Sequence, residues 1–478
     1  MLNKKLTALL LVGAIALGLG GASVLAADQP PGEADSQAQA PEPAQADTSA
    51  QSEDTPSSPE DGENQETSAQ PGEDTPEEGA EPAPEASPDP AGALSFANVD
   101  QRVRAGNLNY LVLEESIAQV EAIDYEELQE DLREGLNGIA NLQWQLHMGG
   151  AMVPDLPDGM EEIEQALRGM LSMSASSASQ SLQSQYDALR EQFDDLKDGK
   201  IQQDAADSVR QLRATQDNLV MLTQSMYIQL SELQATDAAL DRGLAALDRT
   251  IQEMELRYQL GQISALTLQQ TRASRTSLLS QQQTLASSAQ TLTMNLESMI
   301  GADLTGSLRL SALPQVSQEE LDAMDLEADL AAAREASYEL YAAKKTLDDA
   351  RETYEDAGDQ YNYNDRHYEF VQAQHAWQAA QYTYDGAVQS FELSFRTLYA
   401  QVKDYQQVLQ AAQTALAVEQ DNCAVDQLKY EQGTISKNAL LTAQDDLAAA
   451  EETVATAQRN LFSAYNNYRW AVDSGILN

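Results

Sequence analysis

Two very long stretches of the chain contain no proline. Pro314 is the only proline after residue 157. Because proline removes a backbone hydrogen bond and clashes inside a helix, its absence permits uninterrupted helices over residues 158–313 and 315–478. Ala, Gln, Leu, Glu and Ser fill both stretches, and most of these residues favour helix. The sequence therefore predicts an all-α fold in two halves, residues 93–313 and 314–478, connected near Pro314.

Apolar residues in both halves recur at alternating steps of four and three. In the first half they are Leu240, Leu244, Leu247, Ile251, Met254 and Tyr258. In the second half they are Phe391, Phe395, Leu398, Val402, Tyr405, Leu409, Ala412 and Leu416. An average period of about 3.5 residues keeps one narrow seam facing a partner helix, which is the pattern of a coiled coil. We expect long helical arms, one from about Leu212 to Leu260 and another from about Tyr368.

A short motif occurs twice, once in each half. Residues 257–264 read Arg-Tyr-Gln-Leu-Gly-Gln-Ile-Ser, and residues 429–436 read Lys-Tyr-Glu-Gln-Gly-Thr-Ile-Ser. The two copies lie 172 residues apart, as the numbers of Tyr258 and Tyr430 give. An internal repeat of this kind indicates one structural unit used twice.

Each copy of the motif predicts a sharp turn between two antiparallel helices. Gly261 and Gly433 suit the left-handed position just past a helix end, which glycine adopts without steric strain. Ser264 and Ser436 suit the N-cap of the next helix, where a hydroxyl accepts backbone N–H groups. An apolar residue before each cap and one four residues after it would form a hydrophobic staple; these pairs are Ile263 with Leu268 and Ile435 with Leu440.

The twofold Tyr-x-x-Gly-x-Ile-Ser motif resembles that of the TolC-type outer-membrane efflux family. The resemblance covers most of residues 93–478: Ala93 to Gln119 is similar to the opening helix of that family, and Asp325 to Tyr354 is similar to the opening of its second half. In that family three chains form a hollow helical tube, and an adaptor protein couples the tip of the tube to an inner-membrane pump. The resemblance implies a homotrimer with such partners, and it implies that tip and docking residues include Tyr258, Gly261, Ile263, Ser264, Leu268, Tyr430, Gly433, Ile435, Ser436 and Leu440.

The chain departs from the family where each half should carry a pair of β-strands. Neither residues 143–160 nor residues 358–368 show the long alternating runs of barrel strands. We therefore expect the β-barrel strands to be absent or vestigial. Tyr361, Tyr363 and Tyr368 cluster in the second of these places. They are either an aromatic belt at a membrane interface or a loop cluster packed on itself.

The N-terminal part of the chain reads as targeting and spacer sequence. Residues 1–27 have a positive start, an apolar run and a small-residue end, which predicts a cleaved signal peptide; the alternative is a retained membrane anchor. Residues 28–92 are rich in Pro, Glu and Ser and lack any large apolar residue. Such a segment is expected to be a disordered acidic linker, acting either as a tether or as a solubilising tail.

Charge and composition exclude several functions. The chain has 28 basic and 77 acidic residues, for a net charge of −49, and so acidic a surface repels nucleic acid. His147, His367 and His375 lack the close spacing of a metal site, and the single cysteine, Cys423, is expected to pack in a helix seam. We find no catalytic, cofactor-binding or metal-binding residues in the sequence.

The sequence therefore predicts a non-enzymatic protein of the cell envelope. The first interpretation is a helical conduit for export or efflux, located in the outer membrane or periplasm of a two-membrane cell and otherwise outside the cell or at its surface. The alternative is an exported coiled-coil scaffold without transport activity.

Overall fold

The computed structural model of the chain describes residues 89–90, 92–149 and 161–477. The predicted signal peptide and nearly all of the predicted linker lie outside these residues, as do residues 150–160. Of these described residues, 85% are helical and 1% are in strands, which confirms the predicted all-α class.

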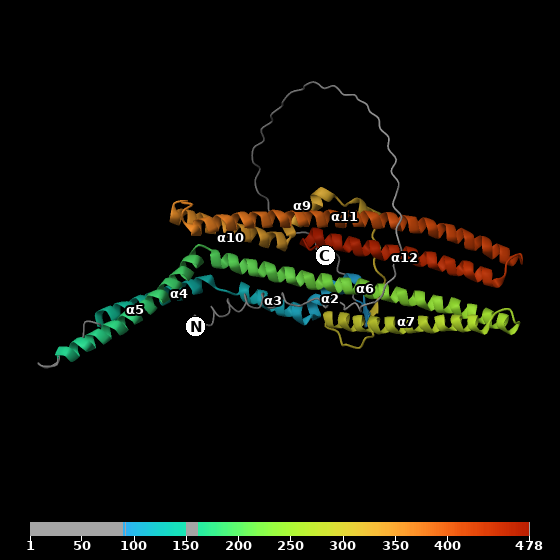
Figure 1. Ribbon diagram of the computed structural model, residues 1–478, viewed down its shortest axis with the longest axis horizontal. Coiled ribbons are helices and arrows are strands. Elements are labelled where there is room, and N and C mark those ends of the chain that lie inside the picture. Colours follow the sequence, from blue (N-terminus) through green and yellow to red (C-terminus); the bar gives the residue numbers. More distant parts are fainter. Residues whose placement is uncertain (1–88, 91, 150–160, 478) are drawn as a thin grey trace, which may run out of the picture. The chain divides into compact units, whose positions relative to one another are not determined.

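Figure 1 shows the elements in their order along the chain. The first half contains β1 (Ala93–Leu94), a 3₁₀ turn (Phe96–Asn98), α2 (Val99–Gly106), α3 (Leu108–Glu121), α4 (Tyr125–Gly149), α5 (Glu161–Lys197), α6 (Lys200–Gln259), α7 (Ala265–Met299) and β2 (Arg309–Leu310). The second half contains α8 (Gln318–Asp322), α9 (Leu326–Ala336), α10 (Tyr338–Tyr361), α11 (Tyr368–Glu431) and α12 (Lys437–Ser474).

The longest helices pair as hairpins. α6 has 60 residues and packs against α7, and α11 has 64 residues and packs against α12. Because α6 also packs on α12, four helices lie side by side in the order α7, α6, α12, α11 (Figure 1). α4 with α5 and α10 with α11 form two further hairpins. α11 begins at Tyr368 as predicted, whereas α6 begins at Lys200 rather than near Leu212, because Gly199 at φ 81° turns the chain between α5 and α6.

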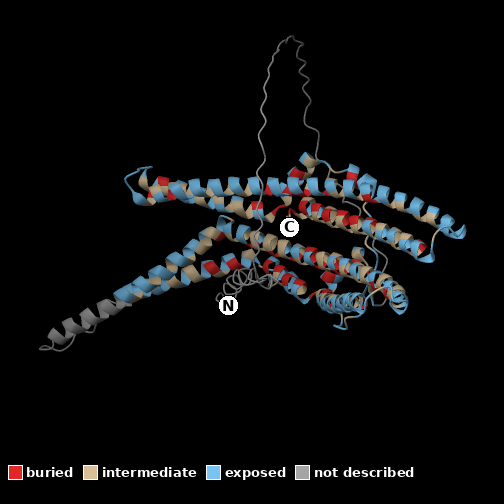
Figure 2. Cartoon of the chain, turned by 45° about the vertical axis from the view of Figure 1, so that its right-hand side comes forward, coloured by how far each residue is buried: buried red, intermediate tan, exposed pale blue. Residues whose placement is uncertain are grey.

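The predicted seam residues face neighbouring helices in most cases, as the burial colours in Figure 2 indicate. On α6, Leu244 and Ile251 are buried, and Leu240, Leu247 and Met254 are half-buried. On α11 the buried residues are Phe391, Phe395, Leu398, Val402 and Ala412. Tyr258 is an exception, because 46% of it is exposed at the end of α6. The seam therefore stops before the turn.

Each half has its own main apolar core. In the first half, Val99, Val103, Tyr110, Val220, Tyr227 and Leu296 belong to one cluster. In the second half, Leu330, Leu340, Phe391, Phe395, Leu461 and Tyr468 belong to another. These clusters lie away from the two motif turns, where the helices are mostly exposed (Figure 2).

Tyr227 ties the two short strands to the first core. β1 and β2 pair in parallel, with Ala93 opposite Arg309 and Leu94 opposite Leu310. The Tyr227 hydroxyl lies 2.6 Å from the carbonyl oxygen of Ser311 and 3.1 Å from that of Leu94. Burial raises the pKa of Tyr227 to about 12. The hydroxyl is therefore protonated and acts as the hydrogen-bond donor to these carbonyl oxygens.

The stretch that is similar to the family's opening helix, Ala93 to Gln119, is broken between α2 and α3, and the opening of the second half is broken between α9 and α10. In the first half, the side chain of Asn107 accepts the N–H groups of Asn109 and Tyr110 and starts α3 anew. In the second half, the Ser337 hydroxyl accepts the Leu340 N–H and starts α10. These caps compete with continuation of the preceding helix.

A glycine from the end of the same half packs against each break. The backbone of Gly301, just after α7, lies so close to Gly106 that an added Cβ would come within 2.2 Å of the Gly106 oxygen. Gly475, just after α12, lies equally close to Ser337, because an added Cβ would come within 2.3 Å of its Cα. Both glycines are left-handed, at φ 66° and 63°. In each half, the glycine that follows the last long helix thus packs against a helix junction near the start of the same half, at α2–α3 in the first half and at α9–α10 in the second.

The connection between α10 and α11 is a tight turn with aromatic packing. Tyr363 has φ 51°, and its ring lies against the backbone of Gly358. It also contacts Tyr354 and Phe370, with ring centroids 6.2 and 5.7 Å apart. Tyr361 stacks on His367 at 4.8 Å. The cluster therefore packs on itself, as one of the two interpretations expected, whereas Tyr368 is 73% exposed.

Within the described residues, no helix has an apolar stretch long enough to cross a membrane.

Candidate docking tips

The turn between α6 and α7 is closed by backbone hydrogen bonds around Gly261. Gly261 has φ 70°, its N–H donates to the Tyr258 carbonyl at 2.9 Å, and the Gln262 N–H donates to the Arg257 carbonyl at 2.8 Å. These two bonds are the pattern that ends a helix at a left-handed glycine. They satisfy carbonyl groups that the end of α6 would otherwise leave without partners.

The turn between α11 and α12 repeats this geometry. Gly433 has φ 74°, and its N–H donates to the Tyr430 carbonyl at 2.9 Å. The Thr434 N–H donates to the Lys429 carbonyl at 2.9 Å. The two turns are therefore alike in backbone conformation as well as in sequence.

The helix that follows each turn starts at the expected serine. The Ser264 hydroxyl accepts the Thr267 N–H at 3.2 Å, and the Ser436 hydroxyl accepts the Ala439 N–H at 3.2 Å. Leu268 and Leu440 are buried, and Ile263 and Ile435 are half-buried, as expected for residues on either side of a cap.

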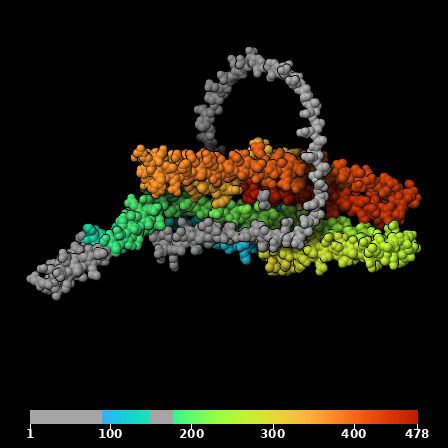
Figure 3. Space-filling model, viewed as in Figure 1, coloured from blue at the N-terminus to red at the C-terminus, as the bar shows by residue number. Residues whose placement is uncertain are grey.

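The two turns lie level with each other. α6 and α12 are joined by three side-chain pairs whose residue numbers each add up to 694: Gln224 with Trp470, Arg242 with Glu452 and Arg249 with Asp445. A constant total means one antiparallel register along the whole contact. The numbers of Gly261 and Gly433 also add up to 694, so both turns lie at the same height. Figures 1 and 3 show them at the same end of the two hairpins.

Polar contacts join the helices near the turns. Between the hairpins, the Asn438 amide donates to the Glu253 carboxylate at 3.1 Å. Within the first hairpin, Arg275 pairs with Asp248 at 2.5 Å, and this hydrogen bond holds the pKa of Asp248 below its usual value. Because these side chains are well exposed, each pair contributes little to stability. The hairpins are therefore joined weakly close to their tips.

Exposed apolar side chains surround both turns, and this feature was missed in the sequence. Leu256 and Leu428 are 57% and 58% exposed and occupy the same place in the repeat, 172 residues apart. Further exposed apolar residues near the turns are Tyr258, Leu260, Leu266, Val425 and Tyr430. The repeat spacing could have revealed the leucine pair, but the sequence does not indicate that its members face solvent. We call this set the tip apolar surface.

No feature of a metal site accompanies the tips. Across the residues that the structure describes, no group of three or more His, Cys, Asp or Glu side chains is placed to hold a metal ion.

Comparison with solved structures finds membrane proteins among the matches. A membrane protein from Pseudomonas aeruginosa matches over 81% of this chain and 92% of its own, with 13% identity and a TM-score of 0.47. The outer-membrane channel OprN matches over 80% and 90%, with 13% identity and a TM-score of 0.48. The Campylobacter jejuni CmeC outer-membrane channel matches over 60% and 68%, with 14% identity and a TM-score of 0.41.

The named matches are outer-membrane channels. They are of the TolC type, the family that the twofold motif resembles. At these identities and TM-scores they assign no role to any residue of this chain. No protein-family model matches the chain, and no curated protein matches it.

Proposed function

We propose that the chain is a helical conduit component for export or efflux across the cell envelope. In this proposal it is exported by its signal peptide, assembles as a homo-oligomer and works with an adaptor and an inner-membrane pump. The family resemblance implies that this oligomer is a trimer. The observation that carries the proposal is the pair of matching turns, level with each other, each bordered by exposed apolar residues.

The open row of helices supports assembly with further copies. α7 and α11 lie at the two edges of the row, and both carry exposed large apolar residues; these include Leu279 on α7 and Val408 and Val418 on α11. When one edge of a chain contacts the opposite edge of the next, the contact is heterologous and generates a ring if the rotation closes. A ring of helix rows encloses a channel through which a solute passes without chemical change.

The tip apolar surface supports docking of an adaptor. Tyrosine is among the residues that contribute most to binding energy when a partner covers them, and Tyr258 and Tyr430 are exposed here. Exposed apolar residues grouped around them are typical of a protein-interaction site. Both hairpins present such residues at the same height, so one partner could engage both turns at once.

The first test is the mass of the full chain in solution, purified without detergent and measured by light scattering over a dilution series. We expect a homo-oligomer, a trimer if the family resemblance holds. A monomer at every concentration would favour the alternative, an exported coiled-coil scaffold.

The second measurement is ethidium retention by cells of the source organism that lack the chain. We expect retention to rise in these cells and to return to normal with the wild-type chain. The double variant Leu256→Ser with Leu428→Ser should fail to restore efflux, whereas Leu304→Ser is the matched control, because Leu304 is 64% exposed but lies beyond the other end of α7. If deletion leaves retention unchanged, the chain is not needed for ethidium efflux, and the oligomeric state then decides between the conduit and the scaffold. If the double variant and the control restore efflux equally, the tips do not dock a partner.

A further inference from the structure

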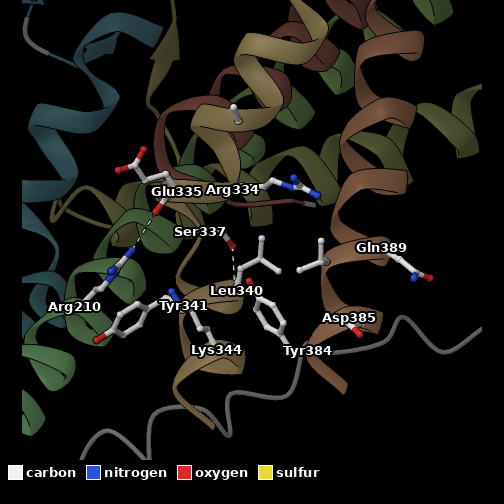
Figure 4. Close-up of a pocket in the computed structure, with 12 residues that line it drawn as sticks. Arg210, Arg334, Glu335, Ser337, Leu340, Tyr341, Lys344, Tyr384, Asp385 and Gln389 are labelled. Carbon is white, nitrogen blue, oxygen red and sulfur yellow. Dashed lines mark hydrogen bonds between the residues drawn. The ribbon is translucent and has the colours of Figure 1, made fainter. Parts of the chain in front are cut away.

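A groove between four helices has features of a ligand site that the conduit proposal does not use. It has a volume of about 600 Å³ and lies where α6, α9, α10 and α11 meet. Figure 4 shows Arg210 and Tyr341 on one side of it, Tyr384, Asp385 and Gln389 on the other, and Leu340 between them. Cavities of about 300–1,000 Å³ suit small organic ligands.

Three cationic side chains line this groove in a chain that has few of them. They are Arg210, Arg334 and Lys344, out of 28 basic residues against 77 acidic ones. Arg334 is paired with Glu392. Among the described residues, neither Arg210 nor Lys344 makes an ion pair with a carboxylate. At the groove, neither charge is in direct contact with a carboxylate, although Asp207 lies near enough to Arg210 for the two charges to attract each other.

The guanidinium of Arg210 is held in place before any ligand arrives. It lies 4.0 Å from the centre of the Tyr341 ring, and it donates to the backbone carbonyl of Glu335 at 3.2 Å. A planar guanidinium held by ring stacking loses little freedom when it binds an anion. The remaining donors of Arg210 are free to face a carboxylate.

The acidic residues nearest to Arg210 on its own helix are already engaged. Asp207 accepts hydrogen bonds from the Tyr341 hydroxyl and from Lys345, and Asp204 accepts one from Lys345 at 2.9 Å. Two carboxylates line the groove itself, those of Glu335 and Asp385. In Figure 4 the Glu335 carboxylate points away from Lys344 and Tyr384. Asp385 is thus the main groove residue that opposes an anion.

Much of the rest of the lining is apolar or aromatic, and Ser337 and Gln389 add polar groups. Leu340, Val388 and the Tyr384 ring form this part of the wall. A ligand that matches the groove has a negatively charged group for Arg210 and Lys344 and a flat apolar body for this wall. A macromolecular polyanion does not fit, because the net charge of −49 repels it.

We propose that this groove binds a small organic anion, an aromatic carboxylate, through Arg210 and Lys344. The site is independent of the tips and of the conduit. It gives the chain a ligand at the junction between the first and second halves.

The test is isothermal titration of the full chain with 2-naphthoate and with its neutral isostere 2-naphthamide. We expect one naphthoate site per chain and at least roughly tenfold weaker binding of the amide, since loss of a charge-assisted hydrogen bond weakens binding by about that factor. Arg210→Gln and Lys344→Gln should each weaken naphthoate binding by roughly fivefold or more. Asp385→Asn should tighten it.

Lys437→Gln is the control, because Lys437 is an exposed lysine at the start of α12 and does not line the groove. Lys344 is exposed, so its variant should fold normally even if Arg210→Gln disturbs the stacking on Tyr341. Absence of naphthoate binding, equal binding of acid and amide, or wild-type affinity in Lys344→Gln would each overturn the proposal.

Discussion

Substituting three glycines of the second half by alanine, one at a time, separates the energetic cost of backbone strain from that of close packing. Gly433 and Gly475 are both left-handed, at φ 74° and 63°, but an added Cβ meets nothing within 4 Å at Gly433. At Gly475 the added Cβ would lie 2.3 Å from both the Cα and the backbone nitrogen of Ser337. Gly386 has neither constraint, because it lies within α11 with open space around it and no positive φ.

These differences predict three distinct effects of substitution by alanine. Gly433→Ala should lower the free energy of unfolding by about 1–2 kcal/mol, the typical left-handed penalty for an L-residue. Gly475→Ala should lower it by about 3–5 kcal/mol, because the same strain is joined by an overlap of more than about 1 Å with backbone that cannot rotate away. Gly386→Ala should raise it by about 0.5–1 kcal/mol, since alanine favours helix over glycine.

Urea unfolding followed by far-ultraviolet circular dichroism measures these changes. Hydrogen exchange then locates them, and the amides around Ser337 should exchange faster in Gly475→Ala but not in Gly433→Ala. If the two variants lose equal stability, the contact between Gly475 and Ser337 does not exist in solution. If Gly433→Ala is not destabilised, the left-handed turn between α11 and α12 is wrong.

Two buried or half-buried carboxylates give predictions of opposite sign. Burial, together with Asp100, raises the pKa of Asp217, so ionised Asp217 opposes folding at neutral pH. Asp217→Asn should therefore raise the urea midpoint at pH 7, and this gain should vanish below about pH 4, where Asp217 is protonated in both states; an equal gain at both pH values would refute the reasoning. For Glu297, burial alone would raise the pKa, but hydrogen bonds from Thr305 and the N–H groups of residues 306–308 outweigh it and lower the pKa. Glu297→Gln should destabilise the chain by about 2–4 kcal/mol at pH 7, and the difference from wild type should shrink as the pH falls below about 4 and Glu297 protonates; a constant difference over this range would contradict the role of its charge.

The turns could be predicted from the sequence because their causes are local. A glycine with a positive φ and a serine that caps the next helix act over a few residues, and Gly261, Ser264, Gly433 and Ser436 all do so. The seam on α11 could also be predicted from the sequence, because its period reflects one helix facing another.

The helix breaks have local causes in the caps at Asn107 and Ser337. The packing that supports these breaks and the composition of the groove depend on residues far away in the chain, and these could not be predicted. The break before α10 is packed against Gly475, which follows it by more than a hundred residues. The groove combines side chains from four helices, and neither Arg210 nor Lys344 belongs to a motif. The heptad spacing did not indicate the exposure of Tyr258, because this spacing continues the seam beyond the point where the partner surface ends; only the family resemblance named Tyr258 as a docking residue.

The glycine contacts that close each half have a consequence for the history and the engineering of the chain. Gly301 meets Gly106 and Gly475 meets Ser337, so each contact joins the end of a half to its own beginning and crosses no boundary between the halves. Each half thus contains its own closing contact, as expected if one module had been duplicated. A cut in the connection between β2 and α8 would leave both glycine contacts intact. This connection is therefore the natural place to separate, exchange or permute the two halves.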